Sequence, residues 1–144
     1  YQSRLAAEKE FQALKMVHPC GVSVPRPITQ NRHVVVMGMI EGDELVEFIQ
    51  IPRPRRILDE ILSNVKKAYH EAGVIHADLS EFNIILKPDD HIMIIDWPQY
   101  VRVNHPNADY LLQRDVKNVL RFFSRKFGVK MKLKDALNFV KGDN

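Results

Sequence analysis

Apolar residues recur at helical spacing in two long stretches of the chain. They fall three or four positions apart between residues 56 and 72, and again between residue 107 and Gly128. This spacing places apolar side chains along one face of a helix. Gly73 and Gly128 each follow the last apolar position, where a helix C-terminal cap is expected. We therefore predict two long amphipathic helices, with buried faces made of Leu58, Ile61, Leu62, Val65 and Tyr69 in the first and Leu112, Val116, Val119, Leu120, Phe123 and Phe127 in the second.

The N-terminal third of the chain contains a further predicted helix and a strand. Residues 1–17 have Ala7, Phe11 and Leu14 at helical spacing, which predicts a helix. Prolines and glycine in residues 18–31 indicate turns and extended chain. The β-branched run at residues 34–37 predicts a buried strand.

Shorter apolar segments fill the remainder. Residues 43–50 are expected to form a short helix and residues 132–140 a last amphipathic helix. Apolar runs at residues 84–86 and 92–95 flank a turn-forming segment, which predicts a β-hairpin. The expected fold class is therefore α+β, mainly helical with a short hairpin.

Composition places few limits on function. The 144 residues suffice for one domain with a core, and 45% hydrophobic and 27% charged residues are ordinary for a globular protein. The net charge of +3 permits an RNA or nucleotide partner, although a surface of mixed charge also explains it. A lone cysteine, Cys20, excludes an internal disulfide and fits a reducing compartment. No apolar run approaches a membrane span, so we expect a cytoplasmic protein without a membrane partner.

The candidate chemistry lies in one loop and the carboxylate that follows it. His76, Asp78 and Asn83 have the His-x-Asp-x4-Asn spacing of a protein-kinase catalytic loop, and Asp96 ends the predicted hairpin. Phosphoryl transfer needs a carboxylate to orient the attacking oxygen and oxygen ligands for magnesium. Asp78 can serve the first need, and Asn83 and Asp96 the second. We expect His76 to brace the loop through hydrogen bonds.

Several stretches of the sequence resemble the RIO family of atypical protein kinases. One group surrounds the loop, and a second group resembles the branch of the family that carries an N-terminal winged helix. The resemblance extends from Tyr1 to about Phe127. It is carried by residues 76–83, 94–99, 105–108 and 114–116 in the first group and by residues 3–7, 24–28 and 31–37 in the second.

The resemblance implies a protein-kinase-like fold and several nucleotide-binding residues. It implies an N-lobe remnant at residues 1–37, a hinge at residues 38–42 and a C-lobe at residues 43–144. Met37, Gly38 and Ile40 would contact the adenine edge of ATP, although Met37 is equally expected as a core methionine. Glu10 matches the helix glutamate that pairs with a phosphate-binding lysine. Without the resemblance, a solvated acid would be the better interpretation of Glu10.

The family pattern also implies cofactors, partners and a phosphoryl acceptor. It implies ATP with Mg²⁺, or Mn²⁺ as an alternative, and a role in maturation of the small ribosomal subunit with its RNA; the protein substrate is not specified. The carboxylate matching Asp96 can itself accept the phosphoryl group in this family. No glycine-rich phosphate loop or strand lysine is present, so we expect this sequence to be the C-terminal part of a kinase.

Asp115 is a candidate support for the catalytic loop. It borders the apolar face of the second long helix, where a carboxylate is costly unless it is hydrogen-bonded. The similarity to ordinary protein kinases, in which a helix aspartate holds the catalytic loop, implies that the loop amides near His76 and Ala77 are the donors. A surface ion pair with Arg114 or Lys117 is the alternative.

Two further functions compete with a RIO-type serine/threonine kinase or ATPase. A small-molecule phosphotransferase of the aminoglycoside or choline kinase type shares the His-x-Asp-x4-Asn pattern, but residues 95–99 and 105–108 argue against it. A non-catalytic scaffold that binds nucleotide or ribosomal RNA is the other. The histidines lack zinc-ligand spacing, and Ser80 lacks the context of a nucleophilic serine.

Overall fold

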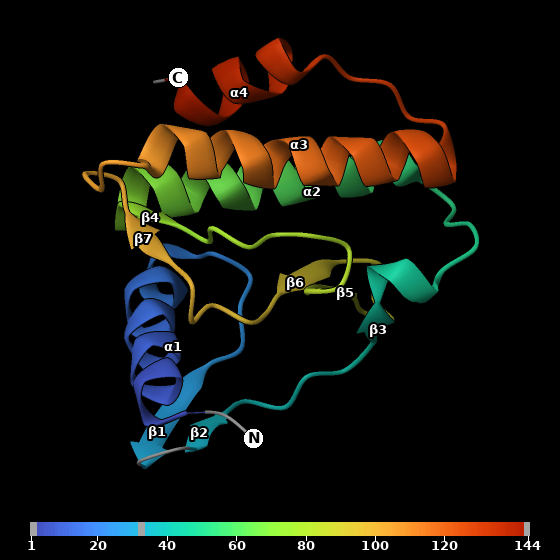
Figure 1. Ribbon diagram of the computed structural model, residues 1–144. Coiled ribbons are helices and arrows are strands. Elements are labelled where there is room, and N and C mark those ends of the chain that lie inside the picture. The colour runs from blue at the N-terminus through green and yellow to red at the C-terminus, as the bar shows by residue number, and fades with distance from the viewer. Residues whose placement is uncertain (1–2, 32–33, 143–144) are drawn as a thin grey trace.

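Two helices, α2 (Pro54–Lys67) and α3 (Ala108–Phe127), form one layer of the molecule, and a third, α4 (Leu133–Lys141), lies on the outer face of this layer. The coordinates are a computed structural model that describes residues 3–31 and 34–142. α2 and α3 lie side by side, and α4 packs across both (Figure 1). This layer covers the loops and short strands that contain the catalytic-loop pattern.

The helix predicted at residues 56–72 differs at both ends. α2 begins earlier because Pro54, which has no amide hydrogen to leave unpaired, occupies its first turn. After Lys67 the chain continues as a π-helical turn, η3 (Ala68–Ala72), and ends at Gly73 with φ 67° as the cap predicts. Four apolar side chains of α2 are buried, namely Ile57, Leu58, Ile61 and Leu62, whereas Val65 and Tyr69 are only half-buried.

The second long helix and the last helix are confirmed. α3 buries the predicted face except for Phe127, which is half-buried, and Gly128 ends it with φ 69°. α4 spans residues that match the expected amphipathic segment, and it buries Ala136 and Val140. A fully buried Val, Leu, Ile or Phe side chain contributes about 1.5–3 kcal/mol to folding.

The N-terminal helix, α1 (Arg4–Val17), lies on the opposite side of the molecule from α4 (Figure 1). Ser3 caps it, because the Ser3 hydroxyl accepts a hydrogen bond from the Ala6 amide at 3.1 Å. The expected face is partly wrong: Ala7 and Leu14 are buried, but Phe11 is half-buried and Glu10 takes an inner position. The predicted start at Tyr1 lies outside the described residues.

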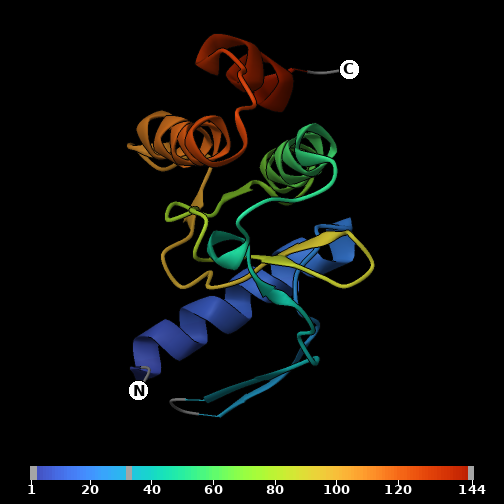
Figure 2. The ribbon, with the colours of Figure 1, turned by 90° about the vertical axis from the view of Figure 1, so that its right-hand side faces the viewer.

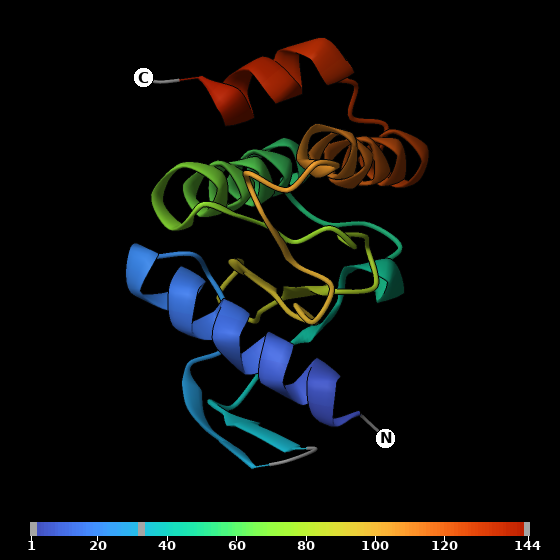
Figure 3. The same ribbon diagram turned by 60° about the vertical axis from the view of Figure 1, so that its left-hand side comes forward.

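Two strands pack against α1 as an antiparallel pair (Figure 3). β1 (Pro27–Asn31) pairs with β2 (Val34–Met37), with Asn31 opposite Val34. β2 was expected, although only Val35 and Met37 turn toward the core and its other residues are exposed. β1 and the 3₁₀ turn η1 (His18–Cys20) replace the turns and extended chain expected before it.

The centre of the molecule holds two small sheets. β3 (Asp43–Glu44), β5 (Ile84–Leu86) and β6 (Ile92–Ile94) form one, and β5 and β6 are the predicted hairpin. β4 (Val74–Ile75) pairs with β7 (Val101–Arg102) in the other. The short helix expected at residues 43–50 is wrong: β3 pairs with β5, and only one 3₁₀ turn, η2 (Leu45–Glu47), follows.

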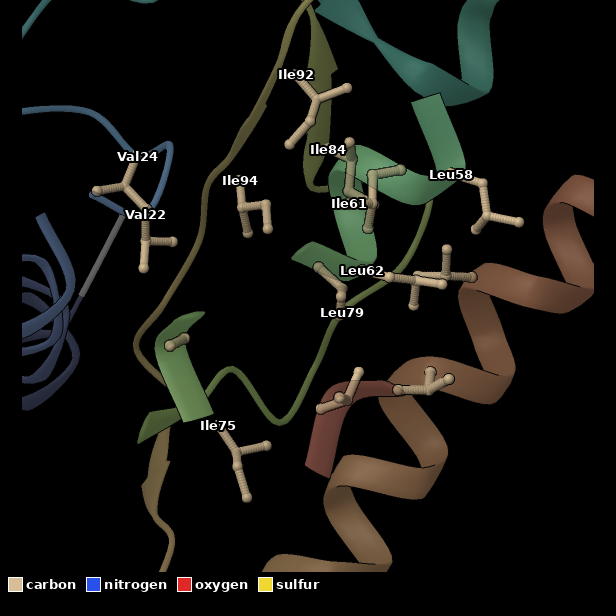
Figure 4. Packing of buried hydrophobic residues seen from close by; sticks show 14 of the residues in the cluster. Val22, Val24, Leu58, Ile61, Leu62, Ile75, Leu79, Ile84, Ile92 and Ile94 are labelled. Carbon is tan, nitrogen blue, oxygen red and sulfur yellow. The ribbon is translucent and has the colours of Figure 1, made fainter. Parts of the chain in front are cut away.

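A single apolar core joins the helical layer to the hairpin. Ile61 of α2 faces Ile84 and Ile92, and Leu79 reaches the same core from the catalytic loop (Figure 4). Figure 2 shows the hairpin between the helical layer and α1. Within the described part of the chain, no helix is long and apolar enough to cross a membrane. The α+β fold class is confirmed, and its core fixes both ends of the loop.

Candidate active site

The catalytic loop, residues 76–83, runs between β4 and β5 beneath α3. It has no regular secondary structure, and its backbone at Ala77 has φ 70°, a left-handed conformation that disfavours a residue with a Cβ atom. Such strain persists only where surrounding contacts enforce it.

Those contacts come from α3. The carboxylate of Asp115 accepts hydrogen bonds from the Ala77 amide at 2.8 Å and from the Leu79 amide at 3.0 Å. The Arg114 guanidinium donates to the Ala77 carbonyl oxygen at 2.7 Å. The buried interpretation of Asp115 is therefore confirmed, with the Leu79 amide in place of that of His76 as the second donor. Burial raises the pKa of Asp115 to about 6, although the two amides and Arg114 oppose the increase.

His76 joins the loop to the segment before Asp96. Its Nδ1 accepts a hydrogen bond from the Asp78 amide at 3.2 Å, so the proton of the neutral ring lies on Nε2, which donates to the Ile95 carbonyl oxygen at 2.9 Å. Burial lowers the pKa of His76 to about 4, which keeps the ring neutral near pH 7. His76 thus makes the hydrogen bonds that were expected of it.

Asn83 closes the far end of the loop. Its side-chain nitrogen donates to the Asp78 carbonyl oxygen at 2.7 Å, and its side-chain oxygen accepts from the Ser80 amide at 2.8 Å. The amide group is buried. An amide oxygen has two lone pairs, so one remains for another donor or a cation.

Asp78 and Asp96 are both exposed and lie close enough to influence each other. Asp96 follows β6 and has φ 62°, a second left-handed residue at this site. Desolvation of its carboxyl group and the nearby charge of Asp78 raise the pKa of Asp96. The hairpin and the loop thus bring two separate carboxylates to one place.

Glu10 reaches the same region from α1. Its carboxylate accepts a hydrogen bond from the Trp97 amide at 3.4 Å, and its side chain is buried. The Trp97 ring lies 4.7 Å from the His76 ring, and its Nε1 donates to the Ile94 carbonyl oxygen. α1 is thereby connected to the residue that follows Asp96.

The expected hinge residues lie apart from these contacts. Met37 is half-buried against the core, in keeping with its interpretation as a core methionine, and Ile40 is exposed. The Gly38 amide donates to the Arg26 carbonyl oxygen at 2.7 Å, so this amide already has a partner. Among the residues that the structure describes, the hydrogen bonds of the catalytic loop do not involve Met37, Gly38 or Ile40.

Two contributors were not identified from the sequence. Arg114 was considered only as a possible surface partner of Asp115, and Trp97 only as part of a motif. Arg114 holds the loop carbonyl, and Trp97 packs on His76 and donates to Glu10. The only sign in the sequence that Arg114 could matter was its position next to Asp115. That position does not show which carbonyl oxygen the guanidinium reaches.

A helix aspartate that holds a strained His-x-Asp loop, with an Asn and a following Asp on the adjoining hairpin, defines the protein-kinase-like class of folds. Comparison with known proteins narrows the class. Residues 1–136 match the model of the RIO domain. The chain therefore belongs to the RIO domain family.

Individual relatives agree with this assignment. The chain is 46% identical over 130 residues to the RIO-type serine/threonine-protein kinase Rio2 of Methanocaldococcus jannaschii, with 87% of this chain and 47% of the relative covered. It is 44% identical over 128 residues to the serine/threonine-protein kinase RIO2 of Caenorhabditis elegans, covering 88% of this chain and 24% of that protein.

A solved structure shows the same fold. The Rio2 kinase–ADP/Mg²⁺–phosphoaspartate complex from Chaetomium thermophilum matches with a TM-score of 0.81 and 34% identity, covering 98% of this chain and 46% of that chain. The chain thus spans about half or less of the length of these relatives.

Proposed function

We propose that the protein containing this chain is an ATP-dependent phosphotransferase of the RIO type, a serine/threonine kinase or ATPase. The observation that carries the proposal is the proximity of two exposed carboxylates, Asp78 and Asp96, at a loop that Asp115, Arg114 and His76 hold by hydrogen bonds. Phosphoryl transfer depends mainly on positioning and charge stabilisation, so two carboxylates on a hydrogen-bonded loop and hairpin suit it.

Asp78 is proposed to orient the attacking oxygen. Its carboxylate is exposed, whereas its backbone is fixed on both sides by His76 and Asn83. A carboxylate held in this way can accept the proton of a hydroxyl group or of water in the transition state.

The donor set beside Asp78 fits Mg²⁺. Asp96 offers carboxylate oxygens and Asn83 the second lone pair of its amide oxygen, which are hard ligands of the kind that Mg²⁺ and Mn²⁺ prefer. Desolvation and the negative charge of Asp78 both raise the pKa of Asp96. A bound cation would relieve the repulsion between the two carboxylates. When bound, Mg²⁺ neutralises charge on the phosphates. Within residues 3–31 and 34–142 no group of three or more His, Cys, Asp or Glu side chains could hold a metal ion, so phosphate oxygens and water would complete the shell.

Nucleotide binding is proposed to involve residues 38–42 as a hinge between residues 1–37 and 43–144. The Gly38 amide is already bonded to Arg26, so the carbonyl of Gly38 and the amide of Ile40 are the groups proposed for the adenine edge. Glu10, buried beside Trp97, is proposed to pair with a phosphate-binding lysine.

An aspartyl-phosphate route is a second candidate at the same site. The name of the Chaetomium thermophilum complex states that it contains a phosphoaspartate with ADP and Mg²⁺. Here a carboxylate oxygen of Asp96 would attack the γ-phosphorus of ATP, and ADP would leave with the electron pair of the broken bond. Water would then attack the phosphorus, releasing phosphate and regenerating the carboxylate. The left-handed backbone of Asp96 and its exposure support access to the nucleotide.

The test is Asp78→Asn in the full-length protein, assayed with ATP labelled on the γ-phosphate. A positioned base contributes about a hundredfold to ten-thousandfold in rate, so turnover should fall by that factor while nucleotide affinity changes little. Wild-type turnover in Asp78→Asn would contradict the proposal that Asp78 orients the attacking oxygen. Loss of nucleotide binding as well would point to a structural role.

The resemblance to RIO proteins, together with the mildly basic net charge of +3, supports a finer proposal: the protein acts on pre-ribosomal small subunits and their RNA. Stimulation of ATP turnover by purified small-subunit particles, but not by choline or an aminoglycoside, would support it and exclude the small-molecule alternative.

A further inference from the structure

A groove of about 520 Å³ lies beside the catalytic loop, between α3 and the residues that follow Asp78. It is within the size range of sites that bind small ligands or a few residues of a peptide. The residues that matter for its chemistry are Ser80, Glu81 and Phe82 on the loop side and Arg121, Arg125 and Lys126 on the α3 side.

The α3 wall of the groove is cationic. Arg121 and Arg125 are one helical turn apart and share a face of α3, and Lys126 follows them. All three side chains are exposed, and none forms an ion pair with a residue in the described part of the chain. Among the lining residues, Glu81 alone carries a negative charge. The groove therefore has an excess of positive charge open to a ligand.

The groove is fixed relative to Asp78. Asn118 of α3 donates to the Leu79 carbonyl oxygen at 3.4 Å, directly after Asp78 in the chain. The same Asn118 accepts a hydrogen bond from the Arg121 guanidinium at 2.6 Å, which aligns that cation along the helix. Figure 1 shows the segment after β4 passing under α3. A polymer in the groove would thus lie against Ser80, Glu81 and Phe82, which follow Asp78 in the same loop.

We propose that this groove binds the polypeptide acceptor through Asp or Glu side chains that flank the Ser or Thr to be phosphorylated. The proposal rests on the proposed function, because that function places the acceptor hydroxyl at Asp78. The distance along α3 from Asn118 to Lys126 is about 12 Å, which is the length of about four residues of extended chain. Two or three acidic side chains in such a segment match the three cations.

The aromatic residues favour a peptide over a single-stranded nucleic acid. Binding of single strands uses successive exposed aromatic rings on which bases stack. In the lining, Phe82 is 58% exposed, but Phe122 is 9% exposed and packs in the core. One exposed ring suits one apolar side chain of a peptide and does not form a stacking row.

Binding can be measured independently of turnover. We would use fluorescence anisotropy of the full-length protein with two labelled peptides that differ only in Glu or Gln on both sides of one Ser, and with an oligouridylate of the same charge as the acidic peptide. The variant is Arg121→Gln with Arg125→Gln. Lys134→Gln with Lys132→Gln is the matched control, since it removes two exposed cations from the α4 region.

The acidic peptide should bind more tightly than the neutral one. The groove variant should lower the affinity for the acidic peptide about tenfold, as expected for the loss of two exposed charge pairs. The control variant should bind like wild type, and both should melt normally. Equal affinity for the two peptides, or tighter binding of oligouridylate with the same loss in the groove variant, would overturn the proposal. Selective acidic-peptide binding without phosphoryl transfer would support the groove and instead contradict the proposed function.

Discussion

The carboxylate of Asp115 accepts a hydrogen bond from the Ala77 amide at 2.8 Å, although the two residues are 38 positions apart in the chain. Ala77 has φ 70°, and the carbonyl oxygen of the same residue is held by Arg114. Both polar groups of this strained peptide segment are thus fixed by neighbouring residues of α3. The loop conformation that presents Asp78 therefore depends on α3. Asp115 supports this conformation without contacting the reacting atoms.

Asp115→Ala should destabilise the protein and lower its activity. Two buried loop amides would lose their acceptor, and an unpaired buried polar group costs about 1–3 kcal/mol. Denaturant unfolding followed by circular dichroism gives the free-energy change, and ATP turnover gives the functional loss. Lys117→Ala, an exposed change on the same helix, is the control and should stay within about 0.5 kcal/mol of wild type. Wild-type melting and turnover in Asp115→Ala would mean that the loop holds its shape without this carboxylate.

The long helices and the need of Asp115 for a donor could be predicted from local patterns, whereas the loop amides as its partners were expected from the likeness to protein kinases. Helical spacing of apolar residues identified α2, α3 and α4, and a carboxylate at the border of an apolar face requires a hydrogen-bond donor. The spacing of His76, Asp78 and Asn83 identified the loop.

The errors arise where tertiary contacts override local preference. Glu44 belongs to a strand because it pairs with Ile85, and Glu10, whose burial the charge pattern alone would not predict, accepts a hydrogen bond from the Trp97 amide. Neither partner is near in sequence. For the same reason, the sequence could not show that Arg114 reaches the Ala77 carbonyl or that Arg26 occupies the Gly38 amide.

Asp96 and Asn83 should respond differently to removal. Asp96→Ala should weaken magnesium-dependent nucleotide binding more than Asn83→Ala, because it removes a charged ligand. Asn83→Ala should instead lower the free energy of unfolding by about 1–3 kcal/mol, since it breaks the bonds to Asp78 and Ser80. Isothermal titration with and without magnesium, together with denaturant unfolding, separates the two effects. Unchanged magnesium dependence in both variants would contradict their roles as ligands.

Gly42→Ala should destabilise the link between the proposed hinge and β3. Gly42 has φ 122°, and a Cβ atom there would meet the Leu86 carbonyl oxygen and approach the Lys87 Cα to 2.9 Å. Backbone atoms cannot move aside easily, so we expect a loss of about 2–4 kcal/mol in unfolding free energy.

Gly128→Ala is the matched control for Gly42→Ala. Gly128 also has a positive φ, 69°, but a Cβ atom there would have nothing within 4 Å. It should cost only the backbone strain, about 1 kcal/mol. Equal losses in the two variants would show that the close approach to Leu86 and Lys87 does not matter.

The pKa changes of His76 and Asp115 have opposite signs, so their effects on the pH dependence of the unfolding free energy should cancel in the wild-type protein. Burial lowers the pKa of His76 from 6.5 to about 4, so its contribution to stability is fully present above pH 6.5 and is lost as the pH falls toward 4. Burial raises the pKa of Asp115 from 3.8 to about 6, so its contribution is fully present below pH 3.8 and is lost as the pH rises through 6. Between about pH 4 and 6 the two contributions change in opposite directions.

Asp115→Asn should expose the His76 contribution. Each contribution corresponds to about 3 kcal/mol, because one pKa unit is worth about 1.4 kcal/mol. Removal of the Asp115 carboxyl leaves only the histidine, so the unfolding free energy of Asp115→Asn, relative to wild type, should decrease by about 3 kcal/mol as the pH falls from 6 to 4. Denaturant unfolding at half-unit pH steps measures this difference, and NMR titration of the His76 ring should give a pKa near 4 in wild type. A difference that stays constant over this pH range, or a His76 ring that titrates near 6.5, would show that the loop does not bury these two groups as described.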